Sequence, residues 1–292
     1  MLFEHTIMEG IQSIYTVLGS TADGIFAFFT FFGEETFLLA AIFSIYWCLD
    51  KRLGEQLLFA MYTAVGINGV AKDLVRRPRP FLTPGFEDLR YVQMDNGLVN
   101  TVHLKDSFSF PSGHSQCSGA FFGTVSLYAK KKWVTALSLA CVVLVMASRL
   151  YLGVHFPTDV ILGALAGLLV ALLCSWAFSK FYAQRLWIFA GVVAVSLVGV
   201  FLSPSPDTVK TIGVGIGAVL GLFWESRFDF SVKGSLGRRM LRLVLGVSLL
   251  MALRVGLKLL FPAGLFFDAL RYGLMGLTAT GLWPWLFTRY NL

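Results

Sequence analysis

Long apolar segments separated by short polar connections run through this sequence from about residue 35 to its end. An apolar stretch of about 20 residues is long enough to cross the hydrocarbon core of a bilayer, which is about 30 Å thick. We expect membrane-spanning segments at residues 35–50, 53–75, 113–130, 133–151, 156–180, 186–202, 208–225, 239–261 and 264–287. The sequence therefore predicts an all-α, polytopic membrane helical bundle.

The composition indicates lipid rather than water as the main solvent. Hydrophobic residues make up 56% of the 292 positions and charged residues only 14%, whereas soluble domains carry about 25% charged residues. The net charge of +7 comes from basic residues scattered between the apolar segments, which fits a membrane surface better than nucleic acid. The four cysteines lie inside apolar runs without zinc-site spacing, so we interpret them as buried free thiols.

The front of the chain differs from the rest. Residues 4–20 fit a short, partly amphipathic helix, and an aromatic-rich run follows from Ile25 to Phe32. We expect residues 1–33 to form an interfacial or re-entrant helical segment. A basic region followed by a small-residue cleavage site does not occur at the start, so we do not expect a cleaved signal peptide.

Basic residues are concentrated in alternate connections between the apolar segments. These connections are Lys51-Arg52, Lys130-Lys131-Lys132, Lys180 with Arg185, and Arg227 through Arg242. The connections at residues 203–207 and 262–264 carry no lysine or arginine. By the positive-inside rule the basic connections face the cytoplasm, so the three polar clusters described next are expected at the extracytoplasmic face.

The first cluster lies at the end of the segment 53–75 and contains Lys72 and Arg79. Their separation of seven residues places them on one face of a helix. Pro78 and Pro80 are expected to end that helix and to aim Arg79 outward from the span. A plain anchor for lipid headgroups is the alternative interpretation.

The second cluster, Pro111-Ser112-Gly113-His114, immediately precedes an apolar segment. Ser112 suits the N-cap position of a helix, whose first amides have no partners within the helix. Such a helix start binds phosphate, and Gly113 allows the backbone to approach a ligand closely. A capping serine beside a solvated histidine is the alternative.

The third cluster contains Arg149, His155 and Asp159. Helical geometry would place His155 and Asp159 on one face within hydrogen-bonding reach, so that the carboxylate fixes the imidazole tautomer. Arg149 can donate two parallel hydrogen bonds to phosphate oxygens. A structural His–Asp pair beside an interfacial arginine is the alternative, but charged residues at membrane depth favour a functional role.

The loop between the first two clusters spans residues 80–110, whereas helix connections are commonly 2–8 residues long. Because the clusters flank this loop, we expect it to cap or gate a site. A disordered linker is the alternative.

Together, the three clusters resemble the signature of the type-two phosphatidic acid phosphatase and vanadium haloperoxidase superfamily. That signature is Lys, six residues, Arg-Pro; then Pro-Ser-Gly-His; then Ser-Arg, five residues, His, three residues, Asp. Every specified position is matched here. The resemblance implies a six-helix-type phosphatase core within residues 34–182, followed at 183–292 by about four additional transmembrane helices of unassigned role.

The resemblance also implies a mechanism. His155 would attack phosphorus to form a phosphohistidine, Asp159 would orient it, and His114 would act as general acid and then as base. The phosphate oxygens would be held by Lys72, Arg79, Arg149, Ser112 and the Gly113 amide. This set can neutralise charge without a metal, so we expect no metal and no cofactor.

Active groups at the ends of spans suit a substrate whose tail stays in the bilayer. We therefore expect a lipid phosphate or diphosphate, with a polyprenyl diphosphate favoured by the resemblance to undecaprenyl-diphosphate phosphatases. Membrane lipids are the other expected partners. The expected location is a multi-pass position in a bacterial cytoplasmic membrane, with the active site on the extracytoplasmic side.

Three other functions are compatible with the clusters. A glucose-6-phosphatase-like enzyme would act on a soluble sugar phosphate, and a non-catalytic carrier would only bind a lipid phosphate. A vanadate-dependent haloperoxidase would share the clusters, but a lipid-embedded site fits halide oxidation poorly.

Several charges fall outside the clusters. Asp268 is expected to pair with Arg254, Lys258 or Arg271 across the last hairpin, and a second polar cavity is the alternative. We interpret Glu34 and its neighbour Glu35 as residues that stabilise the start of a helix through its dipole.

Overall fold

The computed structural model describes residues 2–95, 101–102, 104, 107–202, 205–228 and 230–292. The chain divides into two compact units, and each unit draws on two stretches of sequence. The first unit contains Met1–Leu38 and Ala71–Ser175, and the second contains Leu39–Val70 and Trp176–Leu292. All of the site residues expected from the sequence belong to the first unit.

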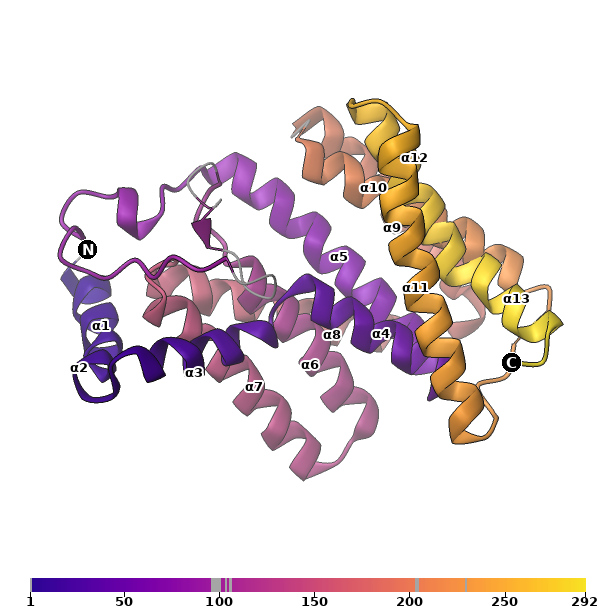
Figure 1. The fold of residues 1–292 in the computed structure, drawn as a ribbon, viewed down its shortest axis with the longest axis horizontal. Coiled ribbons are helices and arrows are strands. Elements are labelled where there is room, and N and C mark those ends of the chain that lie inside the picture. The colour runs from indigo at the N-terminus through magenta and orange to yellow at the C-terminus, as the bar shows by residue number, and fades with distance from the viewer. Residues whose placement is uncertain (1, 96–100, 103, 105–106, 203–204, 229) are drawn as a thin grey trace. The chain divides into compact units, whose positions relative to one another are not determined.

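Apart from the segment between residues 83 and 112, the described part of the first unit is mostly helical (Figure 1). Its elements are α1 (Leu2–Gln12), α2 (Ile14–Leu18), α3 (Ser20–Phe31), the start of α4 (Glu35–Cys48), the end of α5 (Lys51–Val75), η1 (Pro80–Leu82), α6 (Gly113–Ala129), α7 (Lys132–Tyr151) and most of α8 (Pro157–Lys180). Helices α6 and α7 form an antiparallel hairpin, and α3 packs on α7.

Small residues bring α6 and α8 into close contact. A Cβ atom on Gly119 would lie 2.7 Å from the Ala164 carbonyl oxygen, and one on Gly163 would lie 2.7 Å from the Ser112 carbonyl oxygen. Side chains at these glycines would push the helices apart. The close packing places the first turn of α6 beside the first turn of α8, where the Ser112 amide donates a hydrogen bond to the Asp159 carbonyl at 3.1 Å.

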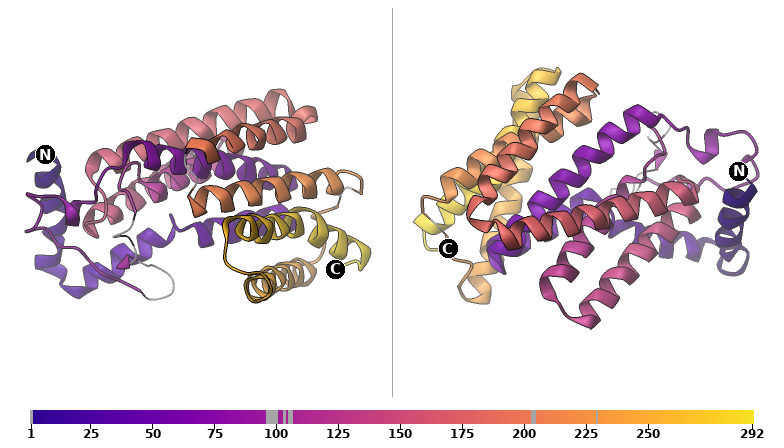
Figure 2. Two further views of the ribbon diagram at one scale, coloured as in Figure 1. Left: turned by 90° about the horizontal axis from the view of Figure 1, so that it is seen from above. Right: turned by 180° about the vertical axis from the view of Figure 1, so that it is seen from behind.

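The second unit holds the remainder of α4, α5 and α8 together with the C-terminal helices. Its further elements are η3 (Tyr182–Gln184), α9 (Arg185–Leu202), α10 (Pro206–Glu225), α11 (Leu236–Leu260), α12 (Leu265–Leu277), the π-helical turn η4 (Thr278–Leu282) and α13 (Trp283–Arg289). Helices α10 and α12 lie side by side in both views of Figure 2. Their contact is tight because a Cβ atom on Gly276 would lie 2.5 Å from the Val214 carbonyl oxygen.

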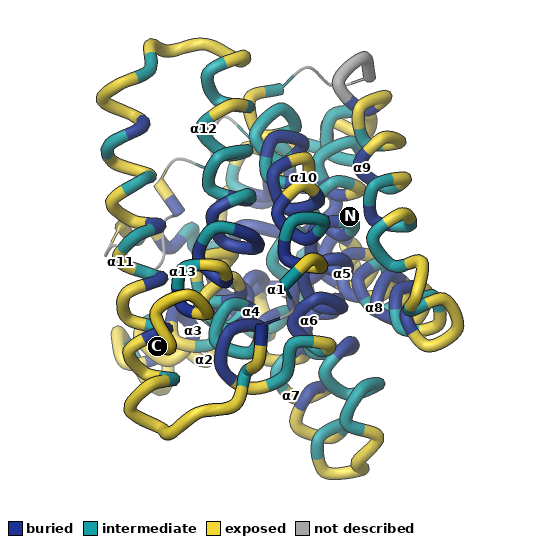
Figure 3. Tube along the Cα trace, turned by 90° about the vertical axis from the view of Figure 1, so that its right-hand side faces the viewer, coloured by how far each residue is buried: buried dark blue, intermediate teal, exposed yellow. Residues whose placement is uncertain are grey.

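Five described helices are long and apolar enough to cross a membrane: Lys132–Tyr151, Pro157–Lys180, Tyr182–Gly199, Pro206–Glu225 and Leu236–Leu260. Helices α3 and α4 pass the same test together, with a bend of 44° between them, as a broken span or a re-entrant loop. Many large apolar side chains are exposed on these helices, and α11 is mostly exposed in Figure 3. Exposed apolar helices of this length require lipid, which confirms the all-α, polytopic membrane fold.

Helices form where the sequence predicts them, but not all of the expected spans meet this criterion. Helix α6 has 17 residues, α12 ends at the π-helical turn, and α5 contains buried polar residues such as Gln56 and Asn68. Near the C-terminus, Arg271 forms an ion pair with Asp268 within α12. One expected partner is therefore confirmed, but the pair does not tie α12 to α11.

Candidate active site

His155 and Asp159 lie at the junction of α7 and α8. His155 occupies the turn before α8, which begins at Pro157, and Asp159 lies in the first turn of α8. Both side chains are buried, and His155 Nδ1 lies 3.6 Å from Asp159 Oδ2. This is an ion-pair distance rather than a hydrogen bond. The expected placement of both residues on one helix is wrong, because proline favours the first helical position and starts α8 after His155.

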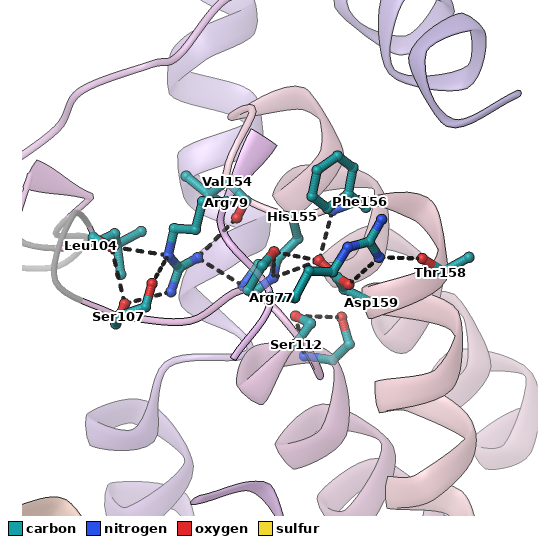
Figure 4. A network of polar contacts seen from close by, with 12 residues as sticks. Arg77, Arg79, Leu104, Ser107, Ser112, Val154, His155, Phe156, Thr158 and Asp159 are labelled. Carbon is teal, nitrogen blue, oxygen red and sulfur yellow. Dashed lines mark hydrogen bonds and ion pairs between the residues drawn. The ribbon is translucent and has the colours of Figure 1, made fainter. Parts of the chain in front are cut away.

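Three donors hold the Asp159 carboxylate. Arg77 Nη1 donates to Oδ1 at 2.8 Å, the Phe156 amide donates to Oδ2 at 2.9 Å, and the Ser109 hydroxyl donates to Oδ2 as well (Figure 4). The Ser109 oxygen also lies 3.4 Å from His155 Nδ1. Ser109 therefore lies between the imidazole and the carboxylate and can link them.

Arg77 is itself held from two sides. Its Nη2 donates to Glu4 Oε2 of α1 at 2.8 Å, and its Nη1 donates to the Thr158 hydroxyl at 2.6 Å. The guanidinium also lies 3.8 Å from the centre of the Phe156 ring, a cation–π contact. These contacts give Arg77 one orientation, with Nη1 directed at Asp159.

Arg79 reaches the site from an extended segment rather than from a helix. Helix α5 ends at Val75, Arg76 adopts a left-handed conformation with φ of 51°, and Arg79 is extended. Lys72 and Arg79 therefore do not share a helical face. The Arg79 side chain is 2% exposed. Prolines at 78 and 80 prevent the helix from continuing to Arg79.

The Arg79 guanidinium lies against His155. Its Nη1 is 3.3 Å from His155 Nε2 and donates to the Val154 carbonyl at 2.8 Å. Its other nitrogens donate to the Leu104 and Ser107 carbonyls at 3.1 Å and to the Ser107 hydroxyl at 2.7 Å (Figure 4). The described part of the 80–110 loop thus fixes Arg79. Residues 96–100, 103 and 105–106 of the loop lie outside the described residues, and the proposed gating role stays a prediction.

Arg149 lies in the last turn of α7 and is 1% exposed. Among the described residues, its Nε and Nη1 atoms are buried and find no hydrogen-bond acceptor. Buried donors without an acceptor cost about 1–3 kcal/mol each, and more when charged. An anion that accepts from these donors would remove that cost.

His114 is the second residue of α6, and its Nε2 lies 2.9 Å from Glu34 Oε1. Ser112 is the N-cap, as expected, and its buried hydroxyl accepts from the Ser115 amide at 3.4 Å. Gly113 is the first residue of the helix. The interpretation of Glu34 as a helix-dipole residue alone misses its contact with His114.

The electrostatics show that residues from all three sequence clusters converge on His155. Burial is the largest cause that lowers the pKa of His155 well below 6.5, and the charges of Arg79, Arg149, Lys72 and His114 add to it. Burial and the neighbouring Arg149 lower the pKa of Arg79 to about 9, so its guanidinium stays charged at neutral pH. A neutral imidazole surrounded by cations is suited to attack a bound anion.

Sequence reasoning missed four residues around the site, and each joins it from a different element: Glu4, Glu34, Arg77 and Ser109. Arg77 lies within the first cluster, and Ser109 lies two residues before the second. Their proximity to the clusters is a signal in the sequence that could have identified them. For the acidic residues, the sequence gives no comparable signal. Within the described residues, no group of three or more His, Cys, Asp or Glu side chains is placed to hold a metal ion.

Comparison with known proteins identifies the family. The pattern of the PAP2 superfamily matches residues 55–183, and that of the PAP2 superfamily phosphatase transmembrane extension matches residues 209–292. Phosphatidylglycerophosphatase B of Bacillus subtilis is 32% identical over 154 residues, which cover 48% of this chain and 68% of the relative. This chain belongs to the PAP2 superfamily. The resemblance noted in the sequence is thereby confirmed.

Two other relatives carry different names. Sphingosine-1-phosphate phosphatase 2 of Homo sapiens is 27% identical over 223 residues, covering 70% of this chain and 52% of the relative. Undecaprenyl-diphosphatase of Sulfolobus acidocaldarius is 28% identical over 154 residues, which cover 51% of this chain and 66% of the relative. The chain thus spans about half to two thirds of the length of these two relatives. No solved structure matches it.

Proposed function

We propose that this PAP2 protein is an integral membrane phosphatase that hydrolyses a lipid phosphate or diphosphate through a phosphohistidine on His155. The observation that carries the proposal is the pair of imidazoles, His155 and His114, set among Lys72, Arg79 and Arg149. The buried Arg149 donors that lack an acceptor among the described residues support an anion at this position.

In the first step, the neutral imidazole of His155 attacks phosphorus through Nε2. The Nδ1 proton is directed to the Ser109 oxygen, whose hydroxyl donates to Asp159, and this chain stabilises the charge that forms on the ring. The bond between phosphorus and the leaving oxygen breaks, and the proton of the His114 imidazolium goes to that oxygen. The products are phosphohistidine, the released alcohol or phosphate, and neutral His114.

In the second step, His114 takes a proton from water while the water oxygen attacks the phosphohistidine. The phosphorus–nitrogen bond breaks, inorganic phosphate leaves, and both histidines return to their starting states. Lys72, Arg79, Arg149 and the Gly113 amide neutralise the phosphoryl oxygens in both steps. The Ser112 hydroxyl caps α6, so we assign Ser112 the role of presenting the first amides of that helix.

The α6–α7 hairpin supports an extracytoplasmic site. The hairpin turn carries Lys130-Lys131-Lys132, while the other end of α7 carries Arg149. A helix of 20 residues is about 30 Å long, the thickness of the hydrocarbon core. Because basic turns face the cytoplasm, the site belongs on the outer side of what we propose is a bacterial cytoplasmic membrane.

The substrate class follows from the membrane fold and the relatives. The relatives are named for undecaprenyl diphosphate, phosphatidylglycerophosphate and sphingosine-1-phosphate, which are all lipid phosphates. This favours a lipid substrate over a sugar phosphate, and we retain polyprenyl diphosphate as the first choice. We also retain residues 34–182 as the phosphatase core, 1–33 as an N-terminal segment and 183–292 as a C-terminal helical part.

Phosphate release from purified protein in detergent tests the proposal. The substrates are a polyprenyl diphosphate, phosphatidylglycerol phosphate, phosphatidate, sphingosine-1-phosphate and glucose-6-phosphate, each with EDTA present. We expect release from at least one lipid phosphate with the chelator present, and loss of release in His155→Ala. Preference for glucose-6-phosphate would contradict the proposed substrate class. Inactivation by EDTA would contradict the metal-independent mechanism.

A further inference from the structure

Each of the two imidazoles of the site has a carboxylate close by. His155 has Asp159, which belongs to the family signature, and His114 has Glu34, whose Oε1 lies 2.9 Å from His114 Nε2. Glu34 lies outside both segments that match the family patterns, residues 55–183 and 209–292. Its contact with His114 is therefore a feature of this chain that those patterns do not describe.

Glu34 is held in place by the packing of the break between α3 and α4. A Cβ atom on Gly33 would lie 2.8 Å from Val145 Cγ1 and 3.1 Å from His114 Cβ. Only glycine lets the backbone come this close to His114. The end of α3 is also fixed to α7, because the buried hydroxyls of Thr30 and Ser148 are 2.6 Å apart.

The environment of His114 explains what a carboxylate contributes there. Burial lowers the pKa of His114 most, and the positive charges of Arg149 and Lys72 lower it further. Glu34 acts in the opposite direction, because a carboxylate in hydrogen-bond contact favours the imidazolium. Glu34 therefore favours the protonated form of His114 against burial and the nearby cations.

We propose that Glu34 is a positioning residue that orients His114 through the 2.9 Å contact and favours its protonated form for delivery of the proton to the leaving oxygen. This inference rests on the proposed function, in which the phosphorus–oxygen bond breaks as His114 gives up its proton. The proton returns when His114 takes one from the attacking water, so Glu34 itself neither gains nor loses a proton.

The nature of the leaving group separates this role from a purely structural one. An alkoxide is a poor leaving group and needs the proton of His114, whereas p-nitrophenolate leaves without it. Glu34→Gln is expected to lower kcat/KM about 100-fold on an alkyl lipid phosphate, within the range for loss of general acid catalysis. On p-nitrophenyl phosphate we expect a loss in kcat/KM of no more than about 5-fold, because kcat/KM reports the first step, which needs no general acid for this leaving group.

The pH profile gives a second readout. Without the carboxylate, His114 loses its proton at lower pH, so the alkaline limb of kcat on the alkyl phosphate should move to lower pH in Glu34→Gln. Glu34→Asp keeps the charge on a shorter side chain and should retain more alkyl phosphatase activity than Glu34→Gln. Glu35→Gln is the matched control, because Glu35 is the next residue and starts α4; its activity should equal that of wild type.

The outcomes separate this inference from the proposed function. Three results would overturn the role of Glu34 while leaving the proposed phosphatase function valid. They are equal losses on both substrates, equal activity of Glu34→Gln and Glu34→Asp, and no loss in Glu34→Gln. Failure of the wild-type protein to release phosphate from any substrate would overturn the proposed function, and the role of Glu34 with it.

Discussion

Arg77 Nη1 donates a hydrogen bond to Asp159 Oδ1 at 2.8 Å, and the Asp159 side chain is fully buried. The neighbouring Arg76 is exposed. In the described part of the chain, the one side-chain hydrogen bond seen for Arg76 runs from its Nε to the Asp73 carbonyl. Of two adjacent arginines, only Arg77 therefore neutralises the buried carboxylate beside the proposed nucleophile.

Arg77→Gln should lower both activity and stability. Removing one partner of a buried charge typically costs about 3 kcal/mol, and a misplaced Asp159 should reduce kcat about 100-fold. Arg76→Gln is the matched control and should leave both properties near wild type. Phosphate release and the thermal midpoint in detergent check this; equal effects of the two substitutions would contradict it.

The pH dependence should reflect the environment of His155. Burial and nearby cations lower the pKa of His155 well below 6.5, so the neutral, nucleophilic form persists as the pH falls through 6.5. The acidic limb of kcat/KM on p-nitrophenyl phosphate should therefore lie well below pH 6.5. An acidic limb at or above pH 6.5 would count against a neutral buried nucleophile.

The same pKa shift has a consequence for stability. In the unfolded chain His155 binds a proton at higher pH than in the folded protein, so its contribution favours unfolding as the pH falls below 6.5. We expect the thermal midpoint of His155→Gln to fall less than that of wild type between neutral and acidic pH. Parallel curves for the two proteins would contradict this.

Arg149→Lys should weaken binding of the phosphoryl group. Among the described residues, the buried Nε and Nη1 donors of Arg149 have no hydrogen-bond acceptor. Lysine keeps the charge but cannot replace these two donors. We predict a loss of about 100-fold in kcat/KM and weaker inhibition by vanadate. Unchanged inhibition by vanadate would show that Arg149 does not face the anion.

Gly33→Ala should disturb the α3–α4 break. The added methyl group would meet Val145 and His114 at 2.8 and 3.1 Å, so it should push the break away from His114 and reduce kcat on an alkyl phosphate about 10- to 100-fold. Gly24→Ala is the control, because nothing lies within 4 Å of a Cβ atom there. Equal activity of the two variants would show that the close approach at Gly33 is dispensable.

The sequence predicted most of the long helices well because runs of apolar residues mark them. The segment expected at 133–151 is α7 at Lys132–Tyr151, and the segment expected at 208–225 is α10 at Pro206–Glu225. The three clusters were also expected to share one site, and electrostatic interactions from all three act on His155.

The remaining features depend on tertiary structure. Glu34 and His114 are separated by 80 residues, and no local periodicity reports their contact. The choice between Arg76 and Arg77 depends on the left-handed conformation of Arg76, which patterns of helix and strand do not encode. The start of α8 at Pro157 is readable from the preference of proline for the first helical position, which places His155 before the helix and outside the helical spacing.

The most direct test of the central claim is phosphoenzyme trapping with His114→Ala and p-nitrophenyl phosphate. The first step does not need an acid for this leaving group, whereas hydrolysis of the intermediate needs a base. We predict an acid-labile, base-stable phosphate that accumulates on His155 and is absent from the His114→Ala, His155→Ala double variant. Phosphate on another residue, or turnover by His155→Ala alone, would contradict the assignment of His155 as the nucleophile.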